Sequence, residues 1–197
     1  SSTIISTTTL ARAAEAAVEA GKEAAAELLE AAPADIEWQA GHYAVAGTDR
    51  RIGLFEVAAQ AGSLEGRADF ASTVASWPAG IAIAEVEVDP ETGAVTLDRF
   101  VAAVDAGTVV NPLLLAGQLH GGFAAGIGQA LMEEARYDAE GQMLSATLMD
   151  YAVPRADDLP GFSHALEGVP TPNNPLGIKG VGELPTNGAP AAVANAV

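Results

Sequence analysis

The middle of the chain reads Ile81-Ala-Ile-Ala-Glu-Val-Glu-Val88, then Asp89-Pro-Glu-Thr-Gly93, then Val95-Thr-Leu-Asp-Arg-Phe-Val101. Both outer stretches are rich in β-branched residues and are separated by turn residues, which predicts two long antiparallel strands. Proline at the second position of the turn and glycine at its end suit a type I turn followed by a bulge. The second strand is expected to continue through Val104-Asp105-Ala106-Gly107.

A long helix is predicted directly after this hairpin. Asn111 is a suitable N-cap and Pro112 a suitable first helical residue, and the helix would run to about Ala135. It contains five glycines, each of which destabilises a helix by up to about 1 kcal/mol relative to alanine. Two explanations remain open and can coexist: close packing against another backbone, or direct contact with a cofactor. The glycines are Gly117, Gly121, Gly122, Gly126 and Gly128.

The remaining segments complete an α+β fold with antiparallel hairpins and a glycine-rich helix. We expect one lobe over residues 1–76 and a second over 77–197. The expected elements are a helix over 10–32 capped by Thr7, Thr8 or Thr9 and ended by Pro33, a hairpin over 36–45, a helix over 54–61, loops over 62–79, further strands and loops over 136–170, and a last helix opened by Asn187 to Pro190.

The composition excludes several classes of function. The net charge of −17, with nine basic residues, disfavours nucleic acid and anionic membranes as partners. The sequence has no cysteine, which excludes disulfides, a cysteine nucleophile and cysteine-held iron–sulfur clusters in this chain. His42, His120 and His164 have no ligand-like spacing, so a protein-held metal site is not expected. No apolar run approaches the ~20 residues of a membrane span, and we expect a cytoplasmic protein.

Common catalytic motifs are also absent. The sequence has no G-x-S-x-G nucleophile elbow and no Walker A motif, and Gly126-Ile-Gly128 lies inside a predicted helix instead of following a strand. Asp105 and Asp150 are better explained as hydrogen-bonding residues of turns or strand ends than as catalytic acids. The chain has no initiator methionine and ends in an apolar helix, so we expect it to be a piece of a longer protein: a fragment of a subunit, a separately produced domain or a product of cleavage.

One carboxylate stands in an unusual setting, Gly177-Ile-Lys-Gly-Val-Gly-Glu183-Leu-Pro185. Glycines allow close approach of a ligand, and a carboxylate held there can act as a general base. The alternative is a surface turn with a solvated glutamate.

Two further features could bind a cofactor. Ser1, Ser2 and Thr3 offer hydroxyl and N–H groups to an anion such as phosphate, although such residues are often simple helix caps. Gln118 in the glycine-rich helix could donate to an oxygen of a bound cofactor, although it could equally face solvent.

The order of motifs resembles a known family. The motifs are Trp77-Pro-Ala-Gly80, Val86-Glu-Val-Asp-Pro-Glu-Thr-Gly93, Val104-Asp-Ala-Gly107, Asn111-Pro112, Gly117-Gln-Leu-His-Gly-Gly122, Gly126-Ile-Gly-Gln-Ala-Leu131, Met149-Asp-Tyr151 and Asn174-Pro-Leu-Gly-Ile-Lys-Gly-Val-Gly-Glu183. Together they resemble the C-terminal part of the large, molybdenum-cofactor-binding subunit of molybdenum hydroxylases. This family includes xanthine dehydrogenase, aldehyde oxidase and aerobic carbon monoxide dehydrogenase.

The resemblance implies a role for each candidate residue. Glu183 is implied to be the base that takes a proton from a molybdenum-bound hydroxyl, and Gly182 to leave room for the cofactor beside it. Gln118 is implied to reach an oxo ligand or the pterin. Ser1, Ser2 and Thr3 are implied to form the loop that holds the pterin and its phosphate.

The resemblance also implies cofactors, partners and substrates. The cofactor is molybdopterin, usually as the cytosine dinucleotide in bacteria, with iron–sulfur clusters and FAD in partner chains or domains. The partners are then the remainder of the molybdenum subunit, an iron–sulfur subunit and an FAD subunit. The substrate would be an aldehyde, a purine or another N-heterocycle, with carbon monoxide also open. The chain alone is expected to be inactive. The alternative function is a non-catalytic structural or assembly module of such a complex.

Overall fold

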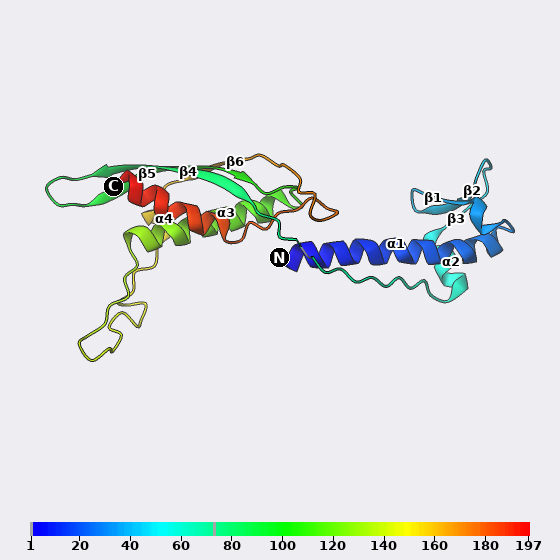
Figure 1. Ribbon diagram of the computed structural model, residues 1–197, viewed down its shortest axis with the longest axis horizontal. Helices are drawn as coiled ribbons and strands as arrows, with labels where there is room; N and C mark the ends of the chain where they lie inside the picture. The colour runs from blue at the N-terminus through cyan, green and yellow to red at the C-terminus, as the bar shows by residue number, and fades with distance from the viewer. Residues whose placement is uncertain (1, 73) are drawn as a thin grey trace. The chain divides into compact units, whose positions relative to one another are not determined.

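A computed structural model describes residues 2–72 and 74–197, and it confirms the α+β class (Figure 1). The chain divides into two compact units, residues 1–73 and 74–197, which are described separately. The sequence-based division into functional lobes at residue 76 stays a prediction. The elements are α1 (Ser2–Leu28), η1 (Pro33–Asp35), β1 (Ile36–Gln39), β2 (His42–Val45), β3 (Arg51–Gly53), α2 (Leu54–Ala61), β4 (Ala79–Val88), β5 (Val95–Asp105), α3 (Pro112–Leu131), η2 (Ala156–Asp158), β6 (Phe162–Leu166) and α4 (Leu184–Ala196).

The first unit packs a three-stranded antiparallel sheet, in the order β1-β2-β3, against α1 and α2. Tyr43 is the centre of its core: it is fully buried, and its hydroxyl donates a 2.9 Å hydrogen bond to the carbonyl of Val18 on α1. Gly21 makes this contact possible, because a Cβ there would lie 2.0 Å from the Tyr43 oxygen. The predicted hairpin over 36–45 and helix over 54–61 are confirmed, whereas β3 was not predicted.

The predicted boundaries of the first helix are wrong at both ends. The helix begins at Ser2, so Thr7 and Thr9 lie inside it, and their hydroxyls donate to the carbonyls of Thr3 and Ile5 instead of capping it. The helix extends upstream because Ile4 and Thr8 continue its buried face. It ends at Leu28, ahead of Pro33, because Glu30 adopts a left-handed backbone conformation (φ +48°).

The second unit contains a three-stranded sheet in the order β4-β5-β6, with α3 and α4 side by side over one face (Figure 1). The β4–β5 hairpin is antiparallel as predicted, and β6 pairs in parallel with β5. Phe100 on β5 is fully buried and packs against Phe123 of α3, with 5.0 Å between the ring centroids. The predicted N-cap is confirmed: the Asn111 side chain accepts a 3.0 Å hydrogen bond from the amide of Leu114. The helix ends at Leu131, four residues earlier than predicted.

Glycines on α3 allow α4 to approach it closely. A Cβ on Gly122 would lie 2.7 Å from Cβ of Pro185, and one on Gly126 would lie 2.8 Å from Cβ of Ala189, both on α4. Gly128 is similarly crowded by the side chain of Pro154. Close packing therefore explains three of the five glycines. The other two, Gly117 and Gly121, have open space where a Cβ would be.

The last helix begins at Leu184, three residues before the predicted start at Asn187. Pro185 explains the difference, because its fixed φ suits the first turn of a helix and its ring is buried against Gly122. The preceding loop therefore ends at Glu183, which occupies the N-cap position of α4. Among the described residues of 136–170, β6 is the only regular strand; an isolated bridge joins Tyr137 and Met143.

Within residues 2–72 and 74–197, no helix has both the length and the apolar character that crossing a membrane requires.

A pair of glycine substitutions tests the close helix contact. Gly126→Ala should destabilise the protein by about 1–3 kcal/mol, because the added methyl overpacks the α3–α4 contact. Gly117→Ala, the matched control on the same helix, should stabilise it by up to about 1 kcal/mol, because it gains helix propensity without a clash. Urea unfolding of the two variants measures both changes. Equal effects of the two substitutions would contradict this packing.

Candidate functional site

Three of the predicted site residues meet in the second unit. The Gln118 Oε1 atom, on α3, lies 3.8 Å from the position that a Cβ on Gly182 would take, and Glu183 follows directly. All three residues are exposed. In the described part of the chain, neither the Gln118 amide nor the Glu183 carboxylate has a hydrogen-bond partner. The site thus presents a free amide next to Gly182 and a free carboxylate on the residue that follows it.

The segment that leads to Glu183 is held by a crossing of two backbone stretches. The amide of Lys179 donates to the carbonyl of Ala106 (3.0 Å), and the amide of Thr108 donates to the carbonyl of Gly177 (2.9 Å). Gly107 and Gly177 both have positive φ (+65° and +67°), and a Cβ on Gly107 would lie 2.3 Å from the Gly177 oxygen. Only glycine fits there.

Asn174 closes the same segment into a small loop. Its side chain accepts a hydrogen bond from the amide of Ile178 (3.1 Å) and donates one to the carbonyl of the same residue (2.8 Å). The residue is buried, with 6% of its surface exposed. Both polar ends of the amide are therefore satisfied, which fixes the loop without leaving a buried group unpaired.

An ion pair ties this loop to the end of β5. Lys179 Nζ donates to Asp105 Oδ2 at 2.5 Å, and the two side chains are 13% and 20% exposed. The Asp105 carboxylate also accepts from the amides of Gly107 and Val169. The hydrogen bond from Lys179, followed by that from Gly107, lowers the pKa of Asp105 from 3.8 to about 2. The expectation that Asp105 is a strand-end hydrogen-bonding residue is confirmed.

The flanks of Glu183 are anchored in the core of the unit. Val181 and Leu184 are partly buried and pack against the core, and Pro185 is buried. Leu184 and Pro185, which follow Glu183, also line a mainly apolar cavity of about 240 Å³. The backbone of Glu183 is thus fixed, while its side chain remains exposed. The other residues that line this cavity are Gly80, Ile81, Ala82, Ala102, Val104, Phe123, Asn187 and Gly188.

The structure places two of the three residues of the predicted phosphate-binding loop inside a helix. Ser2 and Thr3 lie in the first turn of α1, in the first unit, and not in a loop ahead of the helix. The Thr3 carbonyl accepts the hydroxyl of Thr7. Ser1 lies outside the described residues. A role for these residues in phosphate binding stays a prediction.

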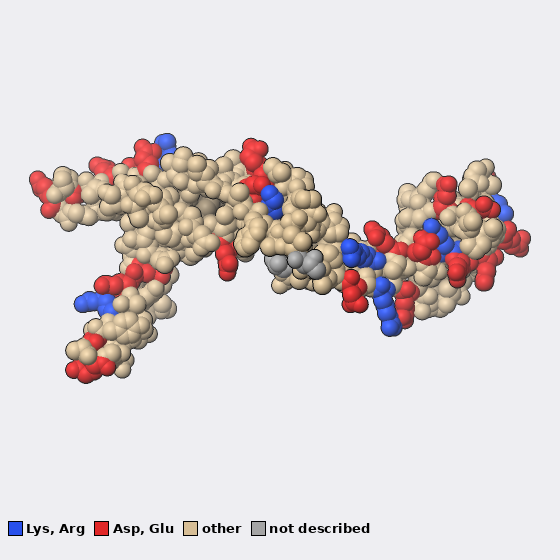
Figure 2. Space-filling view, in the orientation of Figure 1, with Lys and Arg blue, Asp and Glu red and all other residues tan. Residues whose placement is uncertain are grey.

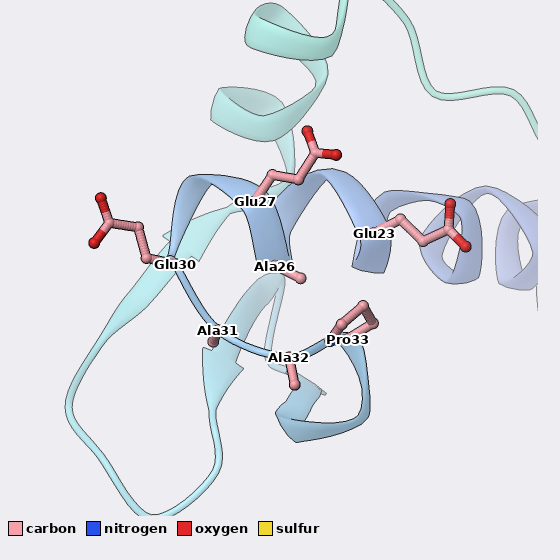
Figure 3. Close-up of a pocket in the computed structure, with 7 residues that line it drawn as sticks. All are labelled: Glu23, Ala26, Glu27, Glu30, Ala31, Ala32 and Pro33. Carbon is pink, nitrogen blue, oxygen red and sulfur yellow. The ribbon is translucent and has the colours of Figure 1, made fainter.

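A hollow of about 530 Å³ in the first unit involves none of the predicted site residues. It lies at the end of α1, and its three glutamates, Glu23, Glu27 and Glu30, extend in different directions (Figure 3). Nowhere in residues 2–72 and 74–197 do three or more His, Cys, Asp or Glu side chains group as metal ligands would. On the face shown in Figure 2, acidic side chains outnumber basic ones, in keeping with the net charge of −17.

Sequence reasoning missed the residues that hold the site. Lys179 and Asn174 belong to the glycine-rich motif, but no pattern of residues indicated that Lys179 pairs with Asp105, 74 residues away. It also missed the contact between His120 and His164, which come from α3 and β6. A parallel pairing of β5 and β6 could have indicated the second contact, but β6 itself was not predicted as a defined strand.

The ion pair predicts a specific loss of stability in acid. Because the pKa of Asp105 is lower in the folded protein, its contribution to stability is complete above about pH 4 and is lost as the pH falls through about 2. Asp105→Asn should therefore destabilise the protein at pH 6, and the difference from the unsubstituted protein should shrink between pH 4 and 2. Urea unfolding at each pH measures this difference, with Asp98→Asn on the same strand as a control. A difference that does not change with pH would contradict the assignment.

Comparisons with known proteins agree on one family. A family model described as a molybdopterin cofactor-binding domain matches residues 1–160. Subunit gamma of the 6-hydroxypseudooxynicotine dehydrogenase complex of Paenarthrobacter nicotinovorans is 37% identical over 100% of this chain and 26% of its own length. The carbon monoxide dehydrogenase large chain of Hydrogenophaga pseudoflava is 33% identical over 85% of this chain and 22% of its own length.

Solved structures show the same relationship. The Cu,Mo-CO dehydrogenase in its carbon monoxide reduced state matches 93% of this chain and 24% of its own, with a TM-score of 0.84 and 30% identity. Quinoline 2-oxidoreductase from Pseudomonas putida 86 matches 91% of this chain and 25% of its own, with a TM-score of 0.79 and 38% identity. The chain spans about a quarter of the length of these relatives. The resemblance found in the sequence is thus confirmed, and the chain belongs to the molybdopterin cofactor-binding domain family.

Proposed function

We propose that this chain forms one wall of the molybdenum-cofactor site in the large subunit of a molybdenum hydroxylase, and that Glu183 is its catalytic base. The observation that carries the proposal is the exposed, unpaired carboxylate of Glu183 on a fixed backbone, next to Gly182 and Gln118. A catalytic base must be able to reach its proton, so an exposed carboxylate on a rigid support suits this role.

The described residues fit a large polar cofactor. Gln118 provides one amide that can both donate and accept a hydrogen bond. Gly117 and Gly121, one helical turn apart, have no atom within 4 Å of where a Cβ would be, and both are exposed. Alanine at these positions would give a more stable isolated helix, so their openness supports close approach of a group from outside this chain. Such a surface suits the flat pterin of a molybdenum cofactor.

The residues of this chain would have separate roles in the reaction. When bound, the molybdenum cofactor supplies the two-electron oxidation of the substrate. Glu183 accepts the proton of the water-derived nucleophile that becomes the oxygen of the product. Gln118 orients the cofactor through its amide. Leu184 and Pro185 provide an apolar surface beside the base, which limits the access of bulk water.

The substrate is proposed to be an aldehyde, a purine or another N-heterocycle, and we favour an N-heteroaromatic ring. Quinoline 2-oxidoreductase, whose name includes such a ring, is 38% identical to this chain, and the match covers 91% of this chain. The apolar surface at Leu184 and Pro185 is compatible with a flat, weakly polar ring.

The complete enzyme is proposed to contain further parts. The relatives are named as a complex subunit and as large chains, which supports association with other subunits. We propose that the remainder of the molybdenum subunit closes the site, and that an iron–sulfur subunit and an FAD subunit remove the electrons. We also propose that the cofactor is the cytosine dinucleotide form.

Replacement of the base in the complete enzyme tests the proposal. Glu183→Gln should lower kcat by roughly 10²–10⁴-fold, because the amide cannot accept the proton, and should leave the molybdenum content unchanged. Steady-state kinetics and metal analysis of the purified complex provide both values. Glu91→Gln, in the exposed β4–β5 turn, is the matched control and should keep full activity.

Two outcomes would count against this function. Full activity of Glu183→Gln would remove the role of Glu183. Absence of molybdenum from the complete unsubstituted complex would favour the alternative function, a non-catalytic structural or assembly module.

A further inference from the structure

Two histidines that are far apart in the sequence meet between α3 and β6. Nε2 of His120 lies 3.3 Å from Nδ1 of His164, although 44 residues separate them. The ring planes are inclined by 76°. His120 is exposed and His164 is partly buried. In the part of the chain that the structure describes, neither ring has another hydrogen-bond partner.

The two rings rest on a rigid support. The His120 ring packs edge-on against Phe162, two residues before His164 on β6, with 5.6 Å between the centroids. Phe162 in turn contacts Phe100 and Phe123 in the core of the unit. Both histidines are therefore attached to elements that are fixed by aromatic packing, and their separation is a property of the fold and not of a flexible loop.

The separation of the two nitrogens agrees with chelation of a metal ion. Imidazole nitrogens bind zinc at about 2.0–2.1 Å, and two of them in a tetrahedral arrangement lie about 3.3–3.4 Å apart. The observed distance is 3.3 Å. We propose that His120 and His164 form a two-histidine site for a divalent transition-metal ion.

The chemistry of the surroundings defines what this site can bind. No third His, Cys, Asp or Glu within residues 2–72 and 74–197 completes a cluster there, so water or a group from outside this chain fills the other positions. Neutral imidazoles prefer zinc, copper and nickel over magnesium and calcium. The net charge of −17 favours accumulation of cations around the chain. The competing explanation is a hydrogen-bonded histidine pair that binds no metal.

Zinc titration of the intact large subunit, after removal of loosely bound metal with a chelator, tests the proposal. Calorimetry should show one site per chain in the unsubstituted protein. His120→Gln and His164→Gln should each weaken the affinity at least about tenfold, because loss of even an indirect partner of a metal typically has an effect of this size. His42→Gln, the remaining histidine, is the matched control and should bind as the unsubstituted protein does. Among the described residues, its ring is hydrogen-bonded only to the carbonyl of Ala40.

Molybdenum content equal to that of the unsubstituted protein shows that each variant is folded. A second measurement needs no substitution: Cu²⁺ bound to the intact subunit should give an electron paramagnetic resonance spectrum with hyperfine coupling to two imidazole nitrogens. The proposal is overturned if the unsubstituted protein binds no zinc, if both variants bind zinc as it does, or if bound copper shows coupling to no pair of imidazoles.

Discussion

The close approach of α3 and α4 is the constraint on which the candidate site depends. Gly122 and Gly126 leave no side chain between the helices, so Pro185 and Ala189 pack directly against the α3 backbone. Because Pro185 lies in the first turn of α4, this contact fixes where that helix begins. Glu183 occupies its N-cap position, and the preceding residue, Gly182, lies next to Gln118. Gly122 and Gly126 lower the helix propensity of α3, but they allow the contact that fixes the position of Glu183.

The second constraint acts from the other side of the same segment. The backbone crossing of Gly107 and Gly177, the buried amide of Asn174 and the Asp105–Lys179 ion pair all hold residues 174–179 against the end of β5. A partly buried ion pair stabilises a structure only when its remaining lone pairs are satisfied, and Asp105 meets this condition through two backbone amides. Glu183 is thus held between two anchored stretches, while its own carboxylate stays unpaired.

Local signals in the sequence predicted the parts of the fold that depend on local chemistry. The β4–β5 hairpin and the Asn111 cap followed from turn and capping residues that act within a few positions. The predicted beginnings of α1 and α4 were wrong. Burial of Ile4 and Pro185 determines where these helices begin, and the nearby polar residues do not. The parallel pairing of β6 with β5 was not predictable, since it depends on contacts across more than 60 residues.

The candidate site shows the same division. Gln118, Gly182 and Glu183 were found from motif order, and the structure brings Gln118 next to Gly182. The ion pair of Lys179 and the meeting of His120 with His164 arise from tertiary packing and leave no pattern in the spacing of residues. The sequence left two explanations equally open for the five glycines in α3: close packing and contact with a cofactor. Three are explained by packing, and the other two face open space.

A crystal structure of the complete large subunit with its cofactor is the most direct test of this site. If Glu183 is the base, its carboxylate should lie within hydrogen-bonding distance of a molybdenum ligand, with Gln118 in contact with the same cofactor and Gly117 and Gly121 facing it. A cofactor bound elsewhere, with Glu183 still exposed to solvent or paired with another side chain, would contradict the central claim.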